Sequence, residues 1–180
     1  MVWLAITPLL FLVLTTIFSH TYDLSYDGQD YHQSAIIALS SRWDPLYQPN
    51  LPLNTSNPVD KPVVEGTGKT AWSIDASIYM LTHNIDSATA INLFIALIAL
   101  SLAFAALLEL GLSPTTSLLV GIASVFTTIF IEQTFSFRED ALSYELLIIG
   151  LSFLILLYKR ITQTDYLLLY LQEYLKILNY

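Results

Sequence analysis

The chain has 180 residues, of which 54% are hydrophobic and only 12% are charged, whereas an ordinary soluble domain carries about one quarter charged residues. Its mean hydropathy is +0.59, so the composition predicts an integral membrane protein. The formal net charge is −8 and the seven Lys and Arg residues are scattered, which argues against nucleic acid as a partner. The chain has no cysteine, which excludes disulfides, thiolate catalysis and cysteine-ligated metals.

Four apolar runs are candidates for membrane-spanning helices. Residues 1–18 are just long enough to cross a hydrocarbon layer of about 30 Å at 1.5 Å per residue. A cleaved signal peptide is the alternative for this run, but no basic region precedes it. We expect three further spans, at about residues 88–109, 114–134 and 140–158.

The distribution of basic residues predicts the orientation of these spans. Lys159 and Arg160 form the only adjacent basic pair, and the positive-inside rule places such a pair in the cytoplasm. Counting back puts the N-terminus in the cytoplasm and residues 19–87 on the external or periplasmic face of the cell membrane. Residues 161–180 mix polar and apolar positions, which favours a cytoplasmic amphipathic tail over a fifth span.

The long loop at residues 19–87 is predicted to contain two amphipathic helices. The stretch "YHQSAIIALSSRW" places its larger apolar residues on one stripe, and "AWSIDASIYMLTH" does the same. The two stripes are Tyr31, Ala35, Ala38, Leu39 and Trp43, and Trp72, Ala76, Tyr79, Met80 and His83. A proline-rich extended segment, residues 44–62, separates them. The predicted fold class is all-α: a multi-span membrane helical bundle with two interfacial helices in its first external loop.

The stretch "SYDGQDYHQ", residues 25–33, concentrates polar side chains directly after the first span. If a helix starts near Asp27, then Asp30 lies on the same face, and the two carboxylates could hold a divalent cation. His32 could assist a carboxylate, bind phosphate when protonated, or complete a metal set. The structural alternatives are that Asp27 or Asp30 caps a helix and that His32 is a polar surface residue.

A second external link, "EQTFSFRED", supplies further charged residues on the same side of the membrane. Arg138 could hold a phosphate through a forked, charge-assisted contact. The alternative is a salt-bridged helix start, at which Glu139 and Asp140 are favoured by the helix dipole.

These motifs resemble part of a known family of membrane enzymes. "YDGQDYHQ", followed by "WDPLYQP" and "AWSIDASIYMLTHNIDSATAINL", is similar to the N-terminal portion of GT-C-type polytopic membrane glycosyltransferases of a bacterial branch. The resemblance implies transfer of a sugar from a polyprenyl-phosphate-linked donor to an acceptor hydroxyl at the external face. Asp27 matches the family's first-loop acidic position and would be the general base. Asp140, with Glu139 beside it, matches a second acidic position. The candidate substrate-binding residues are Asp30, Tyr31, His32, Gln33 and Arg138.

The chain departs from this family by its small number of spans, so it is expected to be an incomplete portion or to need a second chain that supplies the missing spans. Two other hypotheses stay open. One is a non-enzymatic four-span partner or scaffold protein that binds membrane lipid. The other is a metal-dependent membrane hydrolase that uses Asp27, Asp30 and His32. A divalent cation, if one is bound, would otherwise be held by Asp27, Asp30 and Asp140. These residues specify neither the donor sugar nor the acceptor.

Overall fold

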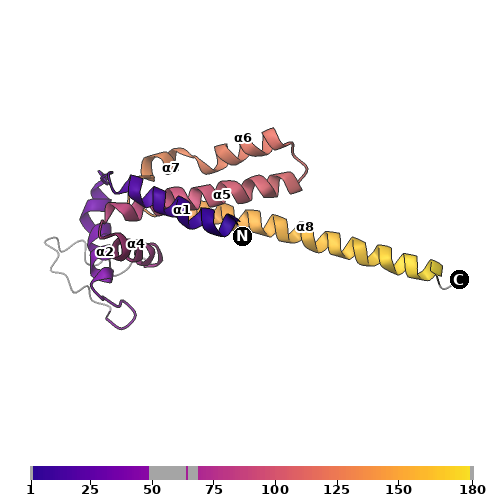
Figure 1. The fold of residues 1–180 in the computed structure, drawn as a ribbon, viewed down its shortest axis with the longest axis horizontal. Helices are drawn as coiled ribbons and strands as arrows, with labels where there is room; N and C mark the ends of the chain where they lie inside the picture. The colour runs from indigo at the N-terminus through magenta and orange to yellow at the C-terminus, as the bar shows by residue number, and fades with distance from the viewer. Residues whose placement is uncertain (1, 49–63, 65–68, 179–180) are drawn as a thin grey trace. The chain divides into compact units, whose positions relative to one another are not determined.

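The computed structural model describes residues 2–48, 64 and 69–178, and all regular structure within them is helical (Figure 1). The elements are α1 (Val2–Phe18), a π-helical turn η1 (Gly28–His32), α2 (Gln33–Ser40), α4 (Thr70–Thr82), a 3₁₀ turn η2 (Asp86–Thr89), α5 (Ala90–Glu109), α6 (Pro114–Val125), α7 (Thr128–Gln133) and α8 (Asp140–Leu178). The chain forms two compact units: unit 1 contains Met1–Ala96 and Phe126–Tyr144, and unit 2 contains Leu97–Val125 and Glu145–Tyr180.

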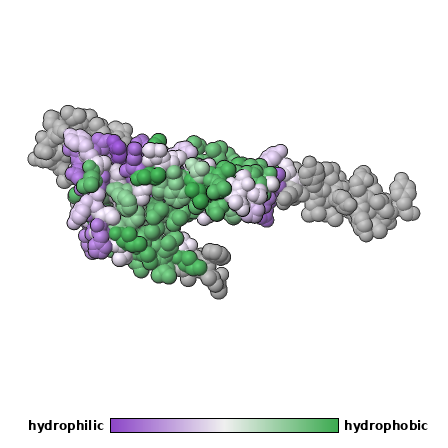
Figure 2. Space-filling model, turned by 90° about the horizontal axis from the view of Figure 1, so that it is seen from above, coloured by the Kyte–Doolittle hydropathy of each residue, from purple (hydrophilic) through white to green (hydrophobic). Residues whose placement is uncertain are grey.

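Two of the described helical segments are long and apolar enough to cross a membrane. They are Asp86–Glu109, with 24 residues, and Asp140–Thr162, with 23 residues. Large apolar side chains remain exposed along the second segment, among them Leu146, Leu151 and Leu154. Figure 2 shows hydrophobic side chains gathered over the long helices. An exposed apolar surface of this kind suits contact with lipid, so the two segments support a membrane protein.

The other two predicted spans are shorter in the structure. The apolar part of α1 that the structure describes in full is Ile6–Phe18, and the predicted span at residues 114–134 is divided between α6 and α7. The division falls at Thr127, whose backbone is extended and whose hydroxyl accepts a hydrogen bond from the Phe130 N–H. A threonine in this arrangement caps a new helix instead of continuing the previous one.

The last helix is longer than predicted. α8 runs without a break from Asp140 to Leu178, so the expected separation between a fourth span and an amphipathic tail near residue 160 is not a helix boundary. The sequence explains this continuity, since it contains neither proline nor glycine after Gly150.

The helices of the first loop form a small core within unit 1. α2 and α4 pack against each other around Ile36, Trp43 and Trp72, and Ala88, Ile91 and Phe137 join the same cluster. α1 lies beside the start of α5, where the rings of Phe11 and Phe94 are 5.1 Å apart.

The predicted apolar stripes of these two helices are confirmed only in part. Ala35, Ala38 and Trp43 are buried as expected, but in α4 the residues Met80 and His83 are exposed. α4 ends at His83, which has a left-handed φ of 54°, so His83 lies beyond the packed face. Most of the predicted extended segment, residues 49–62, lies outside the described residues, while Asp44–Gln48 forms a hydrogen-bonded turn.

Candidate functional site

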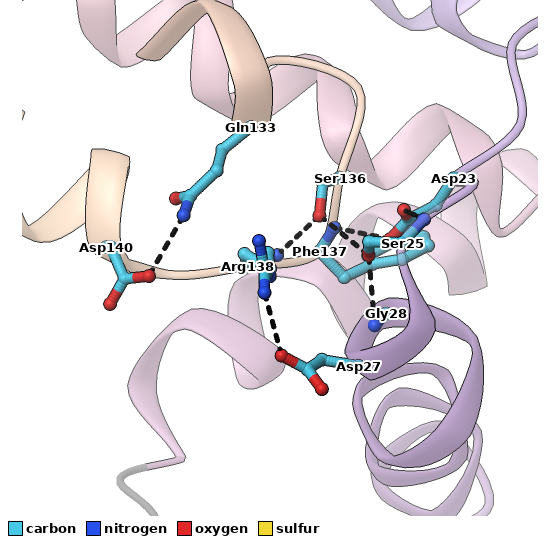
Figure 3. Close-up of polar contacts among 9 residues, drawn as sticks. All are labelled: Asp23, Ser25, Asp27, Gly28, Gln133, Ser136, Phe137, Arg138 and Asp140. Atoms are coloured by element: carbon cyan, nitrogen blue, oxygen red, sulfur yellow. Dashed lines mark hydrogen bonds and ion pairs between the residues drawn. The ribbon is translucent and has the colours of Figure 1, made fainter. Parts of the chain in front are cut away.

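The segment after α1 turns around a buried carboxylate that the sequence analysis did not select. Asp23 is only 3% exposed, and its two side-chain oxygens accept separate backbone hydrogen bonds. The Ser25 N–H donates to Oδ1 at 2.7 Å and the Phe137 N–H donates to Oδ2 at 2.9 Å (Figure 3). These donors replace part of the hydration that the carboxylate loses on burial. Asp23 therefore joins the first loop to the link between α7 and α8.

Gly28 packs directly against this carboxylate. A Cβ atom at position 28 would overlap the Asp23 carboxylate and would lie 2.5 Å from the Ser25 Oγ. The Gly28 N–H donates to the Ser25 Oγ at 3.1 Å, and the same oxygen lies 3.1 Å from the Ser136 Oγ. Position 28 thus admits only glycine without a local rearrangement.

Hydrogen bonds of the Asn92 side chain and of the Gln133 side chain hold the link from Gln133 to Asp140. Asn92, on α5, donates from Nδ2 to the carbonyl oxygens of Gln133 at 3.1 Å and Ser136 at 2.8 Å. The Gln133 side chain donates to the Asp140 Oδ2 at 2.9 Å and accepts from the Ala141 N–H at 2.9 Å. Asp140, the predicted second acidic residue, is therefore engaged at the start of α8 and itself exposed to solvent.

The two predicted polar motifs also meet at an ion pair. The Arg138 Nη2 lies 3.0 Å from the Asp27 Oδ2, although the residues are 111 positions apart (Figure 3). The Arg138 side chain is 42% exposed and that of Asp27 is 35% exposed. The hydrogen bond to Asp27 raises the pKa of Arg138 further above its usual range, so its charge is permanent. An ion pair this accessible contributes little to stability, about 0–1 kcal/mol, and both groups are open to a ligand.

His32 is buried, which contradicts its interpretation as a polar surface residue. It is 5% exposed, and the Trp72 Nε1–H donates to its Nδ1 at 2.6 Å. Burial lowers the pKa of His32 from 6.5 to about 4, so the imidazole is neutral at pH 7 with its proton on Nε2. Burial therefore disfavours the protonated form of His32 that the phosphate-binding prediction requires. His32 ends the π-helical turn and lies three residues before the buried Ala35.

The other candidate residues of the first motif have different surroundings. The Tyr31 ring is 4.3 Å from the His32 ring, and burial together with the negative charge of Asp27 raises the pKa of Tyr31. Asp30 is half-buried, and its backbone oxygen accepts from the Ser34 hydroxyl at 3.0 Å. Gln33 lines a hollow of about 440 Å³, together with Asp23 and Gln29.

Neither predicted metal set is assembled. Within the described residues, no group of three or more His, Asp and Glu side chains is placed to hold a metal ion. The Nδ1 lone pair of His32 is used by Trp72, and Asp140 is bound by Gln133. The divalent cation and the metal-dependent hydrolase are therefore the least supported of the hypotheses.

A second buried carboxyl group, also missed from the sequence, lies on α4. Asp75 is 5% exposed, and its Oδ1 has no hydrogen-bond partner among the described residues. Burial, followed by the negative charge of Glu139, raises the pKa of Asp75 well above its usual value. Burial and the neighbouring Asp140 likewise raise the pKa of Glu139, an effect that Lys69 opposes. Asp75 could have been detected from its register, because it lies between Trp72 and Ala76 on the buried face of the helix.

Comparison of the chain with protein-family models, with curated proteins and with solved structures gives no match. The geometry of the site must therefore support any functional conclusion by itself.

Proposed function

We propose that the chain is the N-terminal part of a GT-C-type membrane glycosyltransferase, which transfers a sugar from a polyprenyl-phosphate-linked donor to an acceptor hydroxyl at the external membrane face. Asp27 is the general base that takes the proton of the acceptor, and Arg138 binds the phosphate of the lipid donor. Spans beyond this chain, or a second chain, complete the cavity for the lipid.

The pairing of Asp27 with Arg138 is the observation that supports this proposal. Sugar transfer requires a carboxylate near the acceptor hydroxyl and a positive group near the phosphate that leaves. The pair brings these two groups to 3.0 Å from separate parts of the sequence and leaves both partly exposed. A purely structural ion pair requires no such exposure.

The setting at the end of α1 also agrees with the proposal. The site belongs to unit 1, as do α1 and the beginnings of both candidate membrane segments. A donor with a long isoprenoid chain would remain in the bilayer while its phosphate reaches the polar residues beyond the helix ends. The proposed topology, with the first loop external, puts this phosphate on the outer side.

A non-enzymatic membrane partner or scaffold protein is the second candidate. It is favoured by the number of polar groups with a structural role, because Asp23, Ser25, Asn92 and Gln133 all bind backbone or side-chain groups of unit 1. In that case the ion pair only fixes the link to the first loop.

Lipid-phosphate binding distinguishes the two candidates without requiring the acceptor to be known. The full chain is reconstituted in lipid nanodiscs, and binding of a radiolabelled polyprenyl monophosphate is measured. We expect saturable binding that weakens about tenfold or more in Arg138→Gln, because a charge-assisted contact to phosphate is lost. The control is Arg42→Gln, which removes an exposed arginine of the first loop. Binding that is absent from the unmodified chain, or equal in both variants, contradicts the glycosyltransferase.

Turnover tests the role of Asp27. With polyprenyl-phosphate sugars as donors, release of polyprenyl phosphate is followed for the chain together with any downstream spans. Asp27→Asn is expected to lower this release by about 10²-fold or more, since general-base catalysis contributes on that order. Asp44→Asn, the same change at an exposed aspartate of the first loop, is the control, and an equal effect of both substitutions would argue against Asp27 as the base.

A further inference from the structure

Asp23 connects two segments that lie far apart in the sequence. Its Oδ1 binds the backbone of its own loop, through the Ser25 N–H, and its Oδ2 binds the Phe137 N–H, 114 positions away. The residue after Phe137 is Arg138, so the backbone atom that Asp23 holds lies one residue from the proposed phosphate-binding side chain. Asp23 is buried, and neither of its oxygens is needed to contact a substrate.

Two serines reinforce this connection. The Ser25 and Ser136 hydroxyl oxygens are 3.1 Å apart, and the Arg138 N–H donates to the Ser136 Oγ at 3.2 Å (Figure 3). The N–H groups of Phe137 and Arg138 are thus both held by groups that belong to or touch the first loop. Since Asp27 lies in the same loop, these contacts hold the backbone of Arg138 close to the loop that carries the Asp27 carboxylate.

We infer that Asp23 is the positioning residue of the site: with Ser25, Gly28 and Ser136 it forms a clasp that holds the Arg138 guanidinium opposite the Asp27 carboxylate. The inference deepens the proposed function and rests on it for the role of Arg138. The clasp itself, defined by the contacts of these four residues, can be tested without any activity.

Cross-linking tests the clasp directly, because the chain contains no cysteine of its own. In the double variant Ser25→Cys/Ser136→Cys, the two sulfur atoms replace oxygens 3.1 Å apart and should form a disulfide upon mild oxidation. Its formation is followed by the loss of maleimide labelling. Adding Asp23→Asn should slow the cross-linking about tenfold, because the amide keeps one acceptor oxygen where the carboxylate has two. Adding Asp30→Asn, the same chemical change in the same stretch, should leave the rate unchanged.

Binding of polyprenyl monophosphate then distinguishes positioning from a merely structural role. In the reduced double-cysteine chain, Asp23→Asn should weaken binding, and oxidation should restore it, because the disulfide replaces the missing clasp contact. Ser25→Ala, which keeps the Asp23 contact to Phe137, should weaken binding less and provides the comparison if Asp23→Asn does not fold when reduced.

Three results would be decisive against the proposals. Equal cross-linking rates with and without Asp23→Asn would overturn the clasp. A disulfide that forms in Asp23→Asn but does not restore binding would overturn the positioning role of Asp23. Absence of binding by the unmodified chain would overturn the proposed function alone, since the cross-linking rates would still decide the clasp.

Discussion

Gly28 has no room for a side chain. Gly28→Ala places a methyl group inside the volume of the Asp23 carboxylate, so either the carboxylate or the turn must move. We expect a loss of about 1–3 kcal/mol in the free energy of unfolding, the usual range for an overpacked site. The measurement is denaturant unfolding of the detergent-solubilised chain.

The chain offers a matched control for this substitution. A Cβ at Gly150, on α8, would meet no atom within 4 Å. Gly150→Ala should therefore be neutral or stabilising by up to about 1 kcal/mol, because alanine favours a helix over glycine. Similar losses in both variants would show that Gly28 is not confined by Asp23.

His32 makes the stability of the loop core depend on pH. Its pKa is about 4 in the folded chain and 6.5 in the unfolded chain, so the unfolded chain takes up the proton first as the pH falls. The stabilisation is complete above pH 6.5 and is lost as the pH falls towards 4, amounting to about 3 kcal/mol at 1.36 kcal/mol per pKa unit.

The pH dependence is measured as the difference in unfolding free energy between the unmodified chain and His32→Gln at pH 7 and pH 4.5. Taking this difference removes the contributions of carboxyl groups that titrate in the same interval. Ser101→Ala, an exposed substitution that removes no titratable group, should show the same difference at both pH values. A difference for His32→Gln that is the same at both pH values would contradict the buried neutral imidazole.

The sequence indicated some of the site residues and misassigned others, for local reasons. Asp27 is a candidate because it matches an acidic position of the family that the chain resembles, and Arg138 because it stands in a charged link between two apolar runs. The structure brings the two side chains together. Asp23 was missed because its partners are backbone N–H groups. Almost every residue carries such a group, so a pattern of side chains does not indicate the contact. Whether Asp27 acts as a base stays a prediction.

Asn92 is the contact between α5 and the link that carries Arg138. Its amide faces two carbonyl oxygens at 2.8 and 3.1 Å, so Asn92→Asp would place a carboxylate oxygen against acceptors. We expect a loss of at least about 2 kcal/mol in unfolding free energy, since a buried donor is replaced by a group that cannot donate. Ser101→Ala, on the exposed side of α5, is the control and should change stability by less than about 0.5 kcal/mol. Equal effects would contradict a role for Asn92 in fixing the link.

The existence of the helices was easier to predict than their boundaries and faces. Long apolar runs correctly predicted helices over most of residues 2–18, 90–109 and 140–158. The break at Thr127 depends on one side-chain hydrogen bond, and the burial of His32 depends on its contact with Trp72 of α4. Neither departure changes the composition of its segment, so hydrophobic periodicity alone does not reveal them.

The site lies entirely within one of the two compact units. Its geometry can therefore be tested separately from the number and orientation of the membrane spans. Asp23, Asp27 and Arg138 all belong to unit 1. The two candidate membrane segments begin in unit 1 and continue into unit 2. The proposed four-span topology therefore needs a test that does not depend on the site.

Single cysteines provide that test. Ser41, at the end of α2, and Ser113, between α5 and α6, are both exposed. If the first loop is external, Ser41→Cys in intact cells should react with a membrane-impermeant maleimide, whereas Ser113→Cys should react only after permeabilisation. The unmodified chain is the blank, because it has no thiol. Labelling of Ser113→Cys in intact cells would overturn the topology.

The contact between Gly28 and the Asp23 carboxylate also predicts which positions should vary together in related chains. In related chains, a substitution at position 28 should be accompanied by a substitution at position 23, because any side chain at 28 displaces the carboxylate. Ser25 lies between them, giving the pattern D-x-S-x-x-G directly after an apolar helix, followed much later by S-x-R before another. Distant relatives whose overall sequences have diverged too far to align could therefore be recognised by these few coupled positions.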